Sequence, residues 1–547
     1  MEKKNAIVMT TQNIISKYIL LIILVISIPA VRYLFIYGYF GVSDDLHIGW
    51  LYEMDRVVKM LQFPPRFVPD LSYGFGYPLF NFVYPLPFYI AEIFHLVGFS
   101  LVNSVKLVFG LSIPLSMYFM FKLLRIYMKE DFSLAGAVLY VYAPYRALEI
   151  FVRGTIGEIV AFVFFPLIIL AVIKKKPYIL ALSFAGLILS HNIMAYMFMP
   201  FLLLFTILNR SFLISLKGLV LGLLCSIYFW LPAIYESGLV KYDTVFNFYD
   251  HYPTLKQMIT PYWGYGASVA GPYDTMSFYM GLVGFAVVVF GSFLFLKNLK
   301  KFSAEEKIFI AWGIVIFLVS IFMMNHRSAY LWRNLPFLPY FQFPWRFLAM
   351  VTFTFSIFVI AFSKFKIFRF VPFIIIIFAI FINFKYFKTS EYLGRNDDYY
   401  INRYIPSLSV SEEYKNTSEE YLRLPKDTKV RPDKVYPRAY TDNPDVIFKI
   451  EELSPLNAII KTDSNSDFIL NYNKYNYPGF VAKIDGQKVK IFSGKPFGQI
   501  SFLVPSGKHE VIVEYKEQSL RLAFDIISLV AIGVSVIIIC KKQYQRS

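Results

Sequence analysis

Two adjacent acids, Asp44 and Asp45, follow directly on the first long apolar run of the chain, and His47 comes two residues later. An ionised carboxylate beside a lipid bilayer is costly unless it faces water or a partner, so these acids are candidates for a functional site. A carboxylate in that place could accept the proton of a hydroxyl group as its oxygen forms a new bond. The alternative is that the acids cap an interfacial helix, whose N-terminus favours negative charge.

Glu158 is a second candidate carboxylate, near the start of a later apolar run and shortly after Arg153. Three roles are open for it. It could orient an acceptor molecule, help to hold a divalent metal ion together with Asp44, or simply pair with Arg153.

Three further residues could bind an anion. His191 lies between two short apolar runs, where its imidazole could donate to a phosphate or be an ordinary satisfied polar group. Arg346, in the stretch Phe-Pro-Trp-Arg, could hold a phosphate through two N–H groups at once, and Arg153 could do the same. The alternative for Arg346 is an interfacial anchor that reaches the lipid head groups beside Trp345.

The composition predicts the kind of element that must position these residues. Of the 547 residues 57% are hydrophobic, and the mean hydropathy is +0.53. Apolar runs of about 17–22 residues recur, which is the length of helix that crosses a hydrocarbon core roughly 30 Å thick. The sequence therefore predicts a polytopic α-helical membrane protein rather than a set of soluble domains.

The net charge of +17 does not indicate a nucleic-acid partner. Most lysines and arginines form short clusters beside apolar runs, which is typical of cytoplasmic loops. Cys225 and Cys540 both lie within apolar runs, so we expect no disulfide framework. Lys3 and Lys4 precede an apolar run that no small-residue cleavage site follows, which favours a retained first helix over a cleaved signal peptide.

The segment 78–99 decides the topology. If it crosses the membrane, the basic clusters downstream fall on the outside. If it lies at the interface, as its prolines and aromatic residues favour, all of them fall inside. We therefore expect an interfacial segment, both termini in the cytoplasm, the active site outside the plasma membrane, and about twelve spans. These spans are expected at 18–40, 101–124, 131–145, 157–173, 177–190, 193–208, 213–232, 276–296, 307–324, 347–363, 368–385 and 521–540.

Residues 386–520 are more polar, and their second half alternates apolar and polar residues. Asp485–Gly486 and Ser506–Gly507 fall between the alternating runs as turn signals. This pattern predicts an external β-sandwich between the last two spans. The chain then divides into a transmembrane part (1–385) with its first external loop at 41–100, the β-rich domain (386–520), and a final helix with a cytoplasmic tail (521–547).

The stretch from Asp44 to Gly49 resembles the acidic motif in the first external loop of C-type (GT-C) integral membrane glycosyltransferases, such as protein mannosyltransferases. In that resemblance Asp44 falls on the essential Asp of the motif, Asp45 on its Glu and His47 on its His. Pro85–Leu86–Pro87 looks like the Pro-Pro-Leu element of the same loop, at a different spacing. We expect Asp44 to be the general base, with Asp45 as the reserve candidate and His47 as a further catalytic residue of the motif. Glu158, which lies outside the motif, is a catalytic candidate because it stands at an outer helix start.

Longer stretches are similar to a bacterial membrane family labelled as related to 6-pyruvoyl-tetrahydropterin synthase. The C-terminal domain looks like that of YfhO-like proteins. The label itself finds no support, because no histidine cluster for zinc is present. The resemblance places Tyr77, Arg153, His191 and Arg346 among the substrate-binding residues. Its matching pieces are 74–82, 143–146, 153–158, 189–192, 343–346, 477–486 and 505–509.

These features together predict an inverting glycosyltransferase that uses a lipid-linked sugar donor, a polyprenyl-phosphate sugar, within the membrane lipids. The acceptor would be a cell-envelope glycan, lipid or protein. Such a transfer needs a carboxylate for the hydroxyl proton and cations or donors at the departing lipid phosphate. The resemblance leaves room for a divalent cation, Mg or Mn, although the oxygen ligands form no recognisable cage.

Two other functions remain as alternatives. A transporter, or a lipid- or polysaccharide-handling protein without covalent chemistry, would bury charged residues in mid-helix and show two related halves. A degenerate member of the fold could act as a scaffold through its β-domain. The retained Asp44 and His47 speak against that third interpretation.

Overall fold

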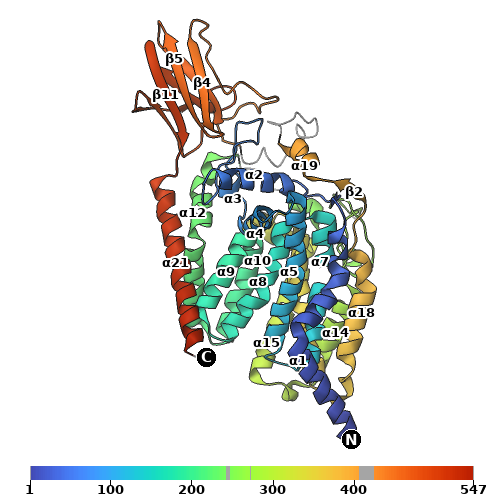
Figure 1. Ribbon diagram of the computed structural model, residues 1–547. Coiled ribbons are helices and arrows are strands. Elements are labelled where there is room, and N and C mark those ends of the chain that lie inside the picture. The colour runs from blue at the N-terminus through green and yellow to red at the C-terminus, as the bar shows by residue number, and fades with distance from the viewer. Residues whose placement is uncertain (1, 242–246, 272, 406–423, 546–547) are drawn as a thin grey trace.

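The computed structural model describes residues 2–241, 247–271, 273–405 and 424–545. Its apolar helices stand side by side, with both chain ends at one end of the bundle and a strand-rich domain at the other (Figure 1). Six segments are long and apolar enough to cross a membrane. They are Lys17–Phe35 in α1 (Glu2–Val31) and the turn after it, α5 (Leu101–Leu124), α8 (Ile156–Ile173), α15 (Ala304–Met324), Pro344–Ser363 with α17 (Leu348–Ser363), and Ser519–Lys542 in α21 (Ser519–Tyr544).

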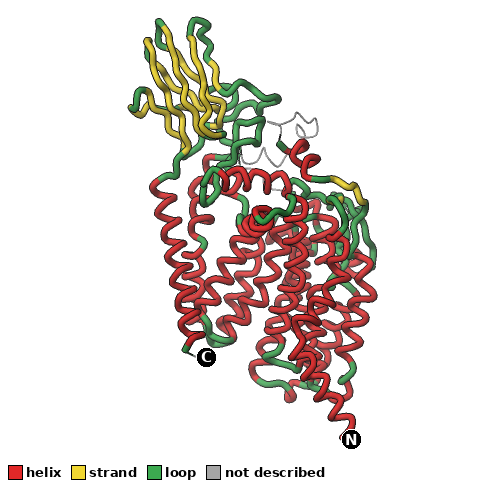
Figure 2. Tube along the Cα trace, in the orientation of Figure 1, coloured by secondary structure: helices red, strands yellow, loops and turns green. Residues whose placement is uncertain are grey.

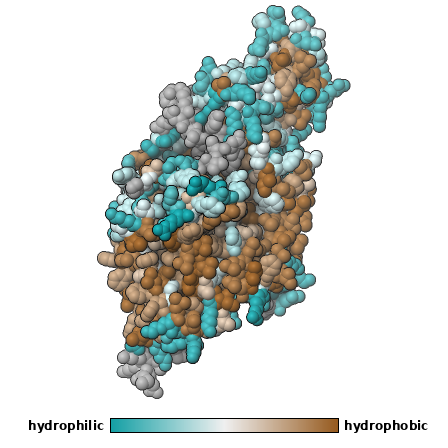
Figure 3. Space-filling model, turned by 180° about the vertical axis from the view of Figure 1, so that it is seen from behind, coloured by the Kyte–Doolittle hydropathy of each residue, from teal (hydrophilic) through white to brown (hydrophobic). Residues whose placement is uncertain are grey.

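A further span is broken. Helices α11 (Phe212–Cys225) and α12 (Ile227–Glu236) meet at Ser226 with a bend of 68°, although the apolar run through them predicted one helix. The other apolar helices are shorter: α6 (Glu130–Val141), α9 (Pro177–Ser190), α10 (Asn192–Leu208), α14 (Leu282–Lys297) and α18 (Val371–Asn383). On the face seen in Figure 3, hydrophobic residues cover the bundle between hydrophilic ends. The chain thus has the helices of a multi-pass membrane protein, while the count of twelve spans stays a prediction.

Short helices cover the end of the bundle that faces the strand-rich domain. Helix α2 (His47–Lys59) lies across this end (Figure 1), and α4 (Leu86–Leu96) packs against it. The eleven residues of α4 are about 16 Å long, roughly half of what a hydrocarbon core requires. Helix α4 is therefore too short to cross the core by itself, and the interfacial position expected for 78–99 stays a prediction. Shorter helices are α3 (Leu79–Phe82), α7 (Pro144–Leu148), α13 (Leu255–Ile259), α16 (Ala329–Asn334) and α19 (Asp397–Tyr404).

The strands gather in the C-terminal part of the chain (Figure 2), as the alternating pattern predicted. One sheet has the order β3-β6-β10-β9 and the other β4-β5-β11-β7-β8. Asp485 and Gly486, both at positive φ, form the tight turn between β7 and β8. The strands of these two sheets are β3 (Ala439–Tyr440), β4 (Ile447–Ser454), β5 (Asn457–Ser464), β6 (Phe468–Tyr475), β7 (Phe480–Ile484), β8 (Gln487–Val489), β9 (Phe492–Ser493), β10 (Gln499–Val504) and β11 (Gly507–Tyr515).

The strand pair β1–β2 joins the chain just before α2 to the segment after α18. Strand β1 (Tyr39–Phe40) is antiparallel to β2 (Tyr392–Arg395). Gly38, at a φ of +73°, lies so close to Gly394 that a Cβ atom would come within 2.5 Å of its backbone. The strand pair therefore fixes the chain just before Asp44.

Buried polar contacts join the strand-rich domain and the last helix to the bundle. Lys474 on β6 donates from Nζ to the carbonyls of Pro69 and Gly74, at 2.8 and 2.7 Å. A second group, which we call the α21 joint, consists of Arg66, Glu236, Glu517, Arg521 and Asp525. In it Arg521 donates to both oxygens of Glu236, at 2.7 and 2.6 Å, and Arg66 donates to Asp525 at 2.6 Å.

Candidate active site

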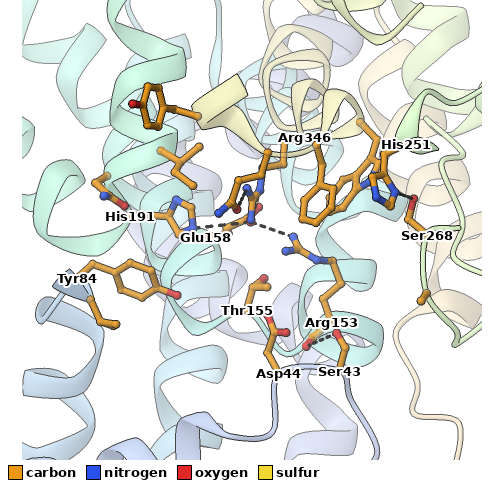
Figure 4. A pocket seen from close by; sticks show the side chains of 18 of the residues that line it. Ser43, Asp44, Tyr84, Arg153, Thr155, Glu158, His191, His251, Ser268 and Arg346 are labelled. Atoms are coloured by element: carbon orange, nitrogen blue, oxygen red, sulfur yellow. Dashed lines mark hydrogen bonds and ion pairs between the residues drawn. The ribbon is translucent and has the colours of Figure 1, made fainter. Parts of the chain in front are cut away.

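A cavity of about 730 Å³ opens beneath α2, at the domain-facing end of the bundle. Its lining comes from the loop before α2, the chain after α3, the start of α8, the connection between α9 and α10, and the segments around 251–276 and 336–346 (Figure 4). Six residues that the sequence predicted for the site line it: Asp44, His47, Arg153, Glu158, His191 and Arg346.

The backbone places Asp44 beside Arg153. The N–H of Asp44 donates to the carbonyl of Arg153 at 2.8 Å, and the N–H of Ser43 donates to Val152 at 3.1 Å. Gly154, which ends the π-helical turn Glu149–Arg153, has a φ of +75°, and a Cβ atom there would lie 2.6 Å from Val42. Glycine is therefore required for this close approach of two chain segments.

Arg153 and Arg346, which we call the arginine pair, share one carboxylate. The Oε1 atom of Glu158 accepts from Arg153 Nη1 at 2.9 Å and from Arg346 Nε at 3.0 Å. Arg153 Nη1 also donates to both oxygens of buried Glu149, at 2.8 Å each. Charge-assisted bonds of this kind fix the orientation of a guanidinium group.

The guanidinium groups of the arginine pair lie against two aromatic rings. The guanidinium carbon of Arg153 lies 4.6 Å from the ring centre of Trp345, and that of Arg346 lies 5.1 Å from Phe343. The two rings stack with an interplanar angle of 12°. Stacking on aromatic faces suits arginine because its guanidinium is planar and weakly hydrated.

Several N–H groups of the arginine pair still have no acceptor. Within the described chain, Arg153 donates through Nη1 and Arg346 through Nε and Nη1, whereas Nε and Nη2 of Arg153 and Nη2 of Arg346 make no hydrogen bond. None of these three atoms is sealed away from the cavity that both side chains line. The cavity can therefore offer fixed, positively charged donors to an anion, and the planar fork of arginine fits phosphate oxygens.

Two of the histidines that line the cavity, His191 and His47, contact the backbone through Nδ1 in opposite senses. His191 Nδ1 accepts from the N–H of Met194 at 3.2 Å, so its proton is on Nε2, which lies 3.8 Å from Glu158 Oε1. Burial lowers the pKa of His191, in the connection between α9 and α10, to about 3, which keeps the ring neutral. His47 Nδ1 lies 3.0 Å from the carbonyl of Gly154, which can only accept, so Nδ1 is the protonated nitrogen. His191 is thus a donor through Nε2, while His47 can accept through Nε2.

The sequence analysis did not predict two of the lining residues, Tyr84 and His251. Tyr84 follows α3, and its ring lies 4.9 Å from that of His191. Burial, together with the charges of Asp44 and Glu158, raises the pKa of Tyr84 above its ordinary value. His251, whose Nδ1 lies 2.9 Å from Ser268 Oγ, was also missed. The i,i+4 spacing of Glu149 and Arg153 could have predicted their ion pair, but nothing local marks Tyr84 or His251.

Asp45 and Tyr77 lie outside the cavity. Asp45 is buried and accepts a hydrogen bond from the hydroxyl of Tyr404 in α19, which places it on the far side of its loop from Asp44. Tyr77 is 1% exposed, and its backbone pairs with that of Val68 in the loop on which the strand-rich domain docks. The geometry therefore gives both residues a structural role in place of the catalytic and substrate-binding roles expected from the resemblance.

Glu158 also has a different role from the catalytic one that the sequence suggested. Its Oε1 accepts from the arginine pair, and its Oε2 accepts from Tyr145 at 3.2 Å. A carboxylate held by two guanidinium groups is a poor proton acceptor, so Glu158 acts on the site by positioning the arginine pair.

The residues do not fit the divalent cation that the resemblance allowed. No group of three or more His, Cys, Asp or Glu side chains that could hold a metal occurs in the described ranges. Both oxygens of Glu158 accept from neighbouring side chains, so Glu158 is not available to Asp44 as a second metal-binding carboxylate. The cations that this cavity offers are guanidinium groups.

Comparison of the chain with family models, curated proteins and solved structures found no match in any of the three. The argument for function therefore depends on the geometry of the cavity.

Proposed function

We propose that this protein is an integral membrane glycosyltransferase. It would transfer a sugar from a polyprenyl-phosphate donor to a hydroxyl group of a cell-envelope acceptor. The observation that carries the proposal is the combination of unused N–H groups on the arginine pair with Asp44 in the same cavity. A phosphate-binding fork and a separate carboxylate are the two parts that such a transfer requires.

In the proposed reaction the acceptor oxygen attacks the anomeric carbon of the sugar, and the bond between that carbon and the phosphate oxygen breaks. The hydroxyl proton passes to Asp44. The lipid phosphate leaves with one more negative charge, which the arginine pair stabilises more strongly than the charge of the intact donor. Attack from the side opposite the phosphate inverts the anomeric configuration.

The other lining residues would assist these two groups. Glu149 and Glu158 hold the arginine pair in place, and the Nε2 proton of His191 can donate to a sugar or phosphate oxygen. Tyr84 stays protonated because its pKa is raised, so it can donate as well. None of these groups needs to change its charge during the transfer, which favours a preorganised site.

The wider architecture belongs to the same proposal. A C-type fold with about twelve spans would place the cavity at the outer edge of the plasma membrane, with both termini in the cytoplasm. The strand-rich domain, as an external sandwich, would stand over it. In its support, Asp44 immediately follows the first candidate span and β1, and both chain ends lie opposite the strand-rich domain (Figure 1).

The experiment uses the purified full chain in lipid nanodiscs with a panel of polyprenyl-phosphate sugars and candidate acceptors, with and without EDTA. Asp44→Asn should lower turnover by about 10²–10⁴-fold, the usual contribution of a general base. Asp45→Asn is the matched control, because it changes the neighbouring acid outside the cavity and should retain most of the turnover.

Two outcomes would reject the proposal. If Asp44→Asn keeps full turnover, Asp44 is not the base. If the wild type binds the donors through the arginine pair but transfers no sugar with any of them, the protein is instead a lipid- or polysaccharide-handling protein without covalent chemistry.

A further inference from the structure

A second concave surface lies on α11, far from the cavity. It is a groove of about 410 Å³, and its lining is apolar except for one lysine. The spacing of the lining residues is i, i+3, i+4, i+7, i+8 and i+11, which places them on one face of the helix. They are Leu213, Leu216, Lys217, Val220, Leu221 and Leu224.

The groove has the length of one membrane leaflet. The eleven steps from Leu213 to Leu224 correspond to about 17 Å along a helix, and half of a hydrocarbon core is roughly 15 Å. Helix α11 starts at the end of the bundle where the chain termini lie, and it packs against α9 and α21. The seven steps from Lys217 to Leu224 correspond to about 10 Å, so the upper part of an acyl chain from that leaflet could lie along this part of the groove.

Two lysines from different helices meet beside the groove, about one turn from its Leu213 end. Lys217 Nζ lies 5.9 Å from the ring centre of Tyr178 on α9, and Lys542 Nζ on α21 lies 5.4 Å from the same ring. Both lysines are exposed. Three helices thus bring two cations to one place beside the apolar groove.

These cations have no acidic partners nearby in the sequence. The stretches 174–190, 209–225 and 526–545 contain no Asp or Glu, although they contain further lysines at 174–176. Elsewhere at this end of the bundle some basic groups are paired: Lys364 contacts Glu306, and Arg125 contacts Glu130. The positive charge beside the groove is therefore uncompensated, whereas the charge around α15 and α17 is partly neutralised.

We propose that this groove binds an anionic phospholipid of the leaflet on the side of the chain termini. The phosphate of the head group lies between Lys217 and Lys542, and one acyl chain follows Val220, Leu221 and Leu224. A basic pocket between membrane helices beside an apolar channel matches both halves of such a lipid, whereas a free phosphate would use only the lysines. The site is independent of the glycosyltransferase proposal.

Native mass spectrometry of the full chain, supplied with equal amounts of phosphatidylglycerol and phosphatidylcholine of the same chain length, tests the proposal. The wild type should retain phosphatidylglycerol in preference. Because each lysine near an anionic surface contributes about fivefold in affinity, Lys217→Gln with Lys542→Gln should lower this retention by about tenfold or more. Val220→Trp, which fills the groove but keeps both charges, should lower it as well.

The matched control is Lys300→Gln with Lys301→Gln, which removes the same charge from the same membrane face away from the groove. Thermal unfolding checks that every variant is folded. The proposal is overturned if this control loses as much phosphatidylglycerol as the Lys217/Lys542 variant, or if Val220→Trp binds as the wild type does. It is also overturned if inorganic phosphate displaces the lipid, because the lysines alone would then account for binding.

Discussion

The arginine pair and the α21 joint are both buried clusters of arginines and acids, but they use their donors differently. In the joint every guanidinium nitrogen has an acceptor: those of Arg521 bind Glu236, Tyr515 and the carbonyl of Pro478. Arg66 likewise donates through all three nitrogens. In the arginine pair, three nitrogens have no acceptor in the described chain.

Burial does not explain this difference, because all four arginine side chains are at most 9% exposed. A fully satisfied buried network rigidifies the structure around it, whereas unused donors beside a cavity are available to a ligand. The comparison therefore assigns the α21 joint to architecture and the arginine pair to binding. Substitutions in the α21 joint should mainly lower stability, whereas substitutions in the arginine pair should mainly lower ligand affinity.

The largest expected effect on stability comes from Arg521→Ala. It leaves Glu236 as a buried carboxylate without its cation, which typically costs about 3–5 kcal/mol. Thermal unfolding in detergent should show the loss. The double variant Arg521→Met with Glu236→Gln should recover much of it, because no unpaired charge remains. Equal stability of the single and double variants would contradict a role for charge pairing in the joint.

Arg346→Lys should act mainly on ligand affinity. Glu158 keeps its bond to Arg153, so little stability is lost, but the planar fork aimed into the cavity disappears. A hydrogen bond to a charged group contributes about 1.5–3 kcal/mol, so binding of a polyprenyl phosphate should weaken roughly 10–150-fold. Lys364→Arg, at the opposite end of the bundle, is a charge-conserving control. Unchanged lipid-phosphate affinity in Arg346→Lys would remove the distinction between the two clusters.

Sequence reasoning found most of the charged residues of the cavity for a physical reason. Acids, His and Arg gather beside the predicted spans on the side opposite the plain Lys and Arg clusters, and this contrast makes Asp44, Arg153, Glu158, His191 and Arg346 conspicuous. It could not find their partners, because the bond between Arg346 and Glu158 joins residues 188 positions apart. That contact, rather than either residue alone, changes Glu158 from a candidate catalyst into a positioning group.

In the fold, too, local sequence patterns predicted the elements but not the features that depend on geometry or on distant contacts. The alternating pattern located the strands, and the turn at Asp485–Gly486 was predicted correctly. Hydropathy could not predict the bend at Ser226, because the apolar run continues through it and the break depends on local backbone geometry. Tyr77 was misplaced because a resemblance in sequence does not distinguish a loop that docks a domain from one that binds a substrate.

The pH dependence of stability tests whether His191 is held neutral in the folded protein, unlike the charged residues around it. Burial lowers the pKa of His191 from its ordinary 6.5 to about 3, so between these values the unfolded chain binds more protons than the folded one. The free energy of unfolding is therefore independent of His191 titration above pH 6.5. Below pH 6.5 it falls by about 1.4 kcal/mol per pH unit, because only the unfolded chain takes up the proton. His191→Gln, which keeps an N–H donor, should lose less stability than the wild type between pH 6.5 and 4.5. Parallel curves for the two proteins would show that His191 is not held neutral by burial.

The smallest expected effect distinguishes the two adjacent acids. Tyr404→Phe removes the hydrogen bond from α19 to Asp45 without touching the cavity, and a bond to a charged group of this kind contributes about 1.5–3 kcal/mol at most to stability. Donor affinity should stay unchanged, as measured with polyprenyl phosphate, because Gly49 packs so tightly on Tyr404 that the ring stays in place. If Tyr404→Phe instead weakens donor binding as much as Arg346→Lys, Asp45 and α19 belong to the binding site, and the division between satisfied and unsatisfied clusters fails.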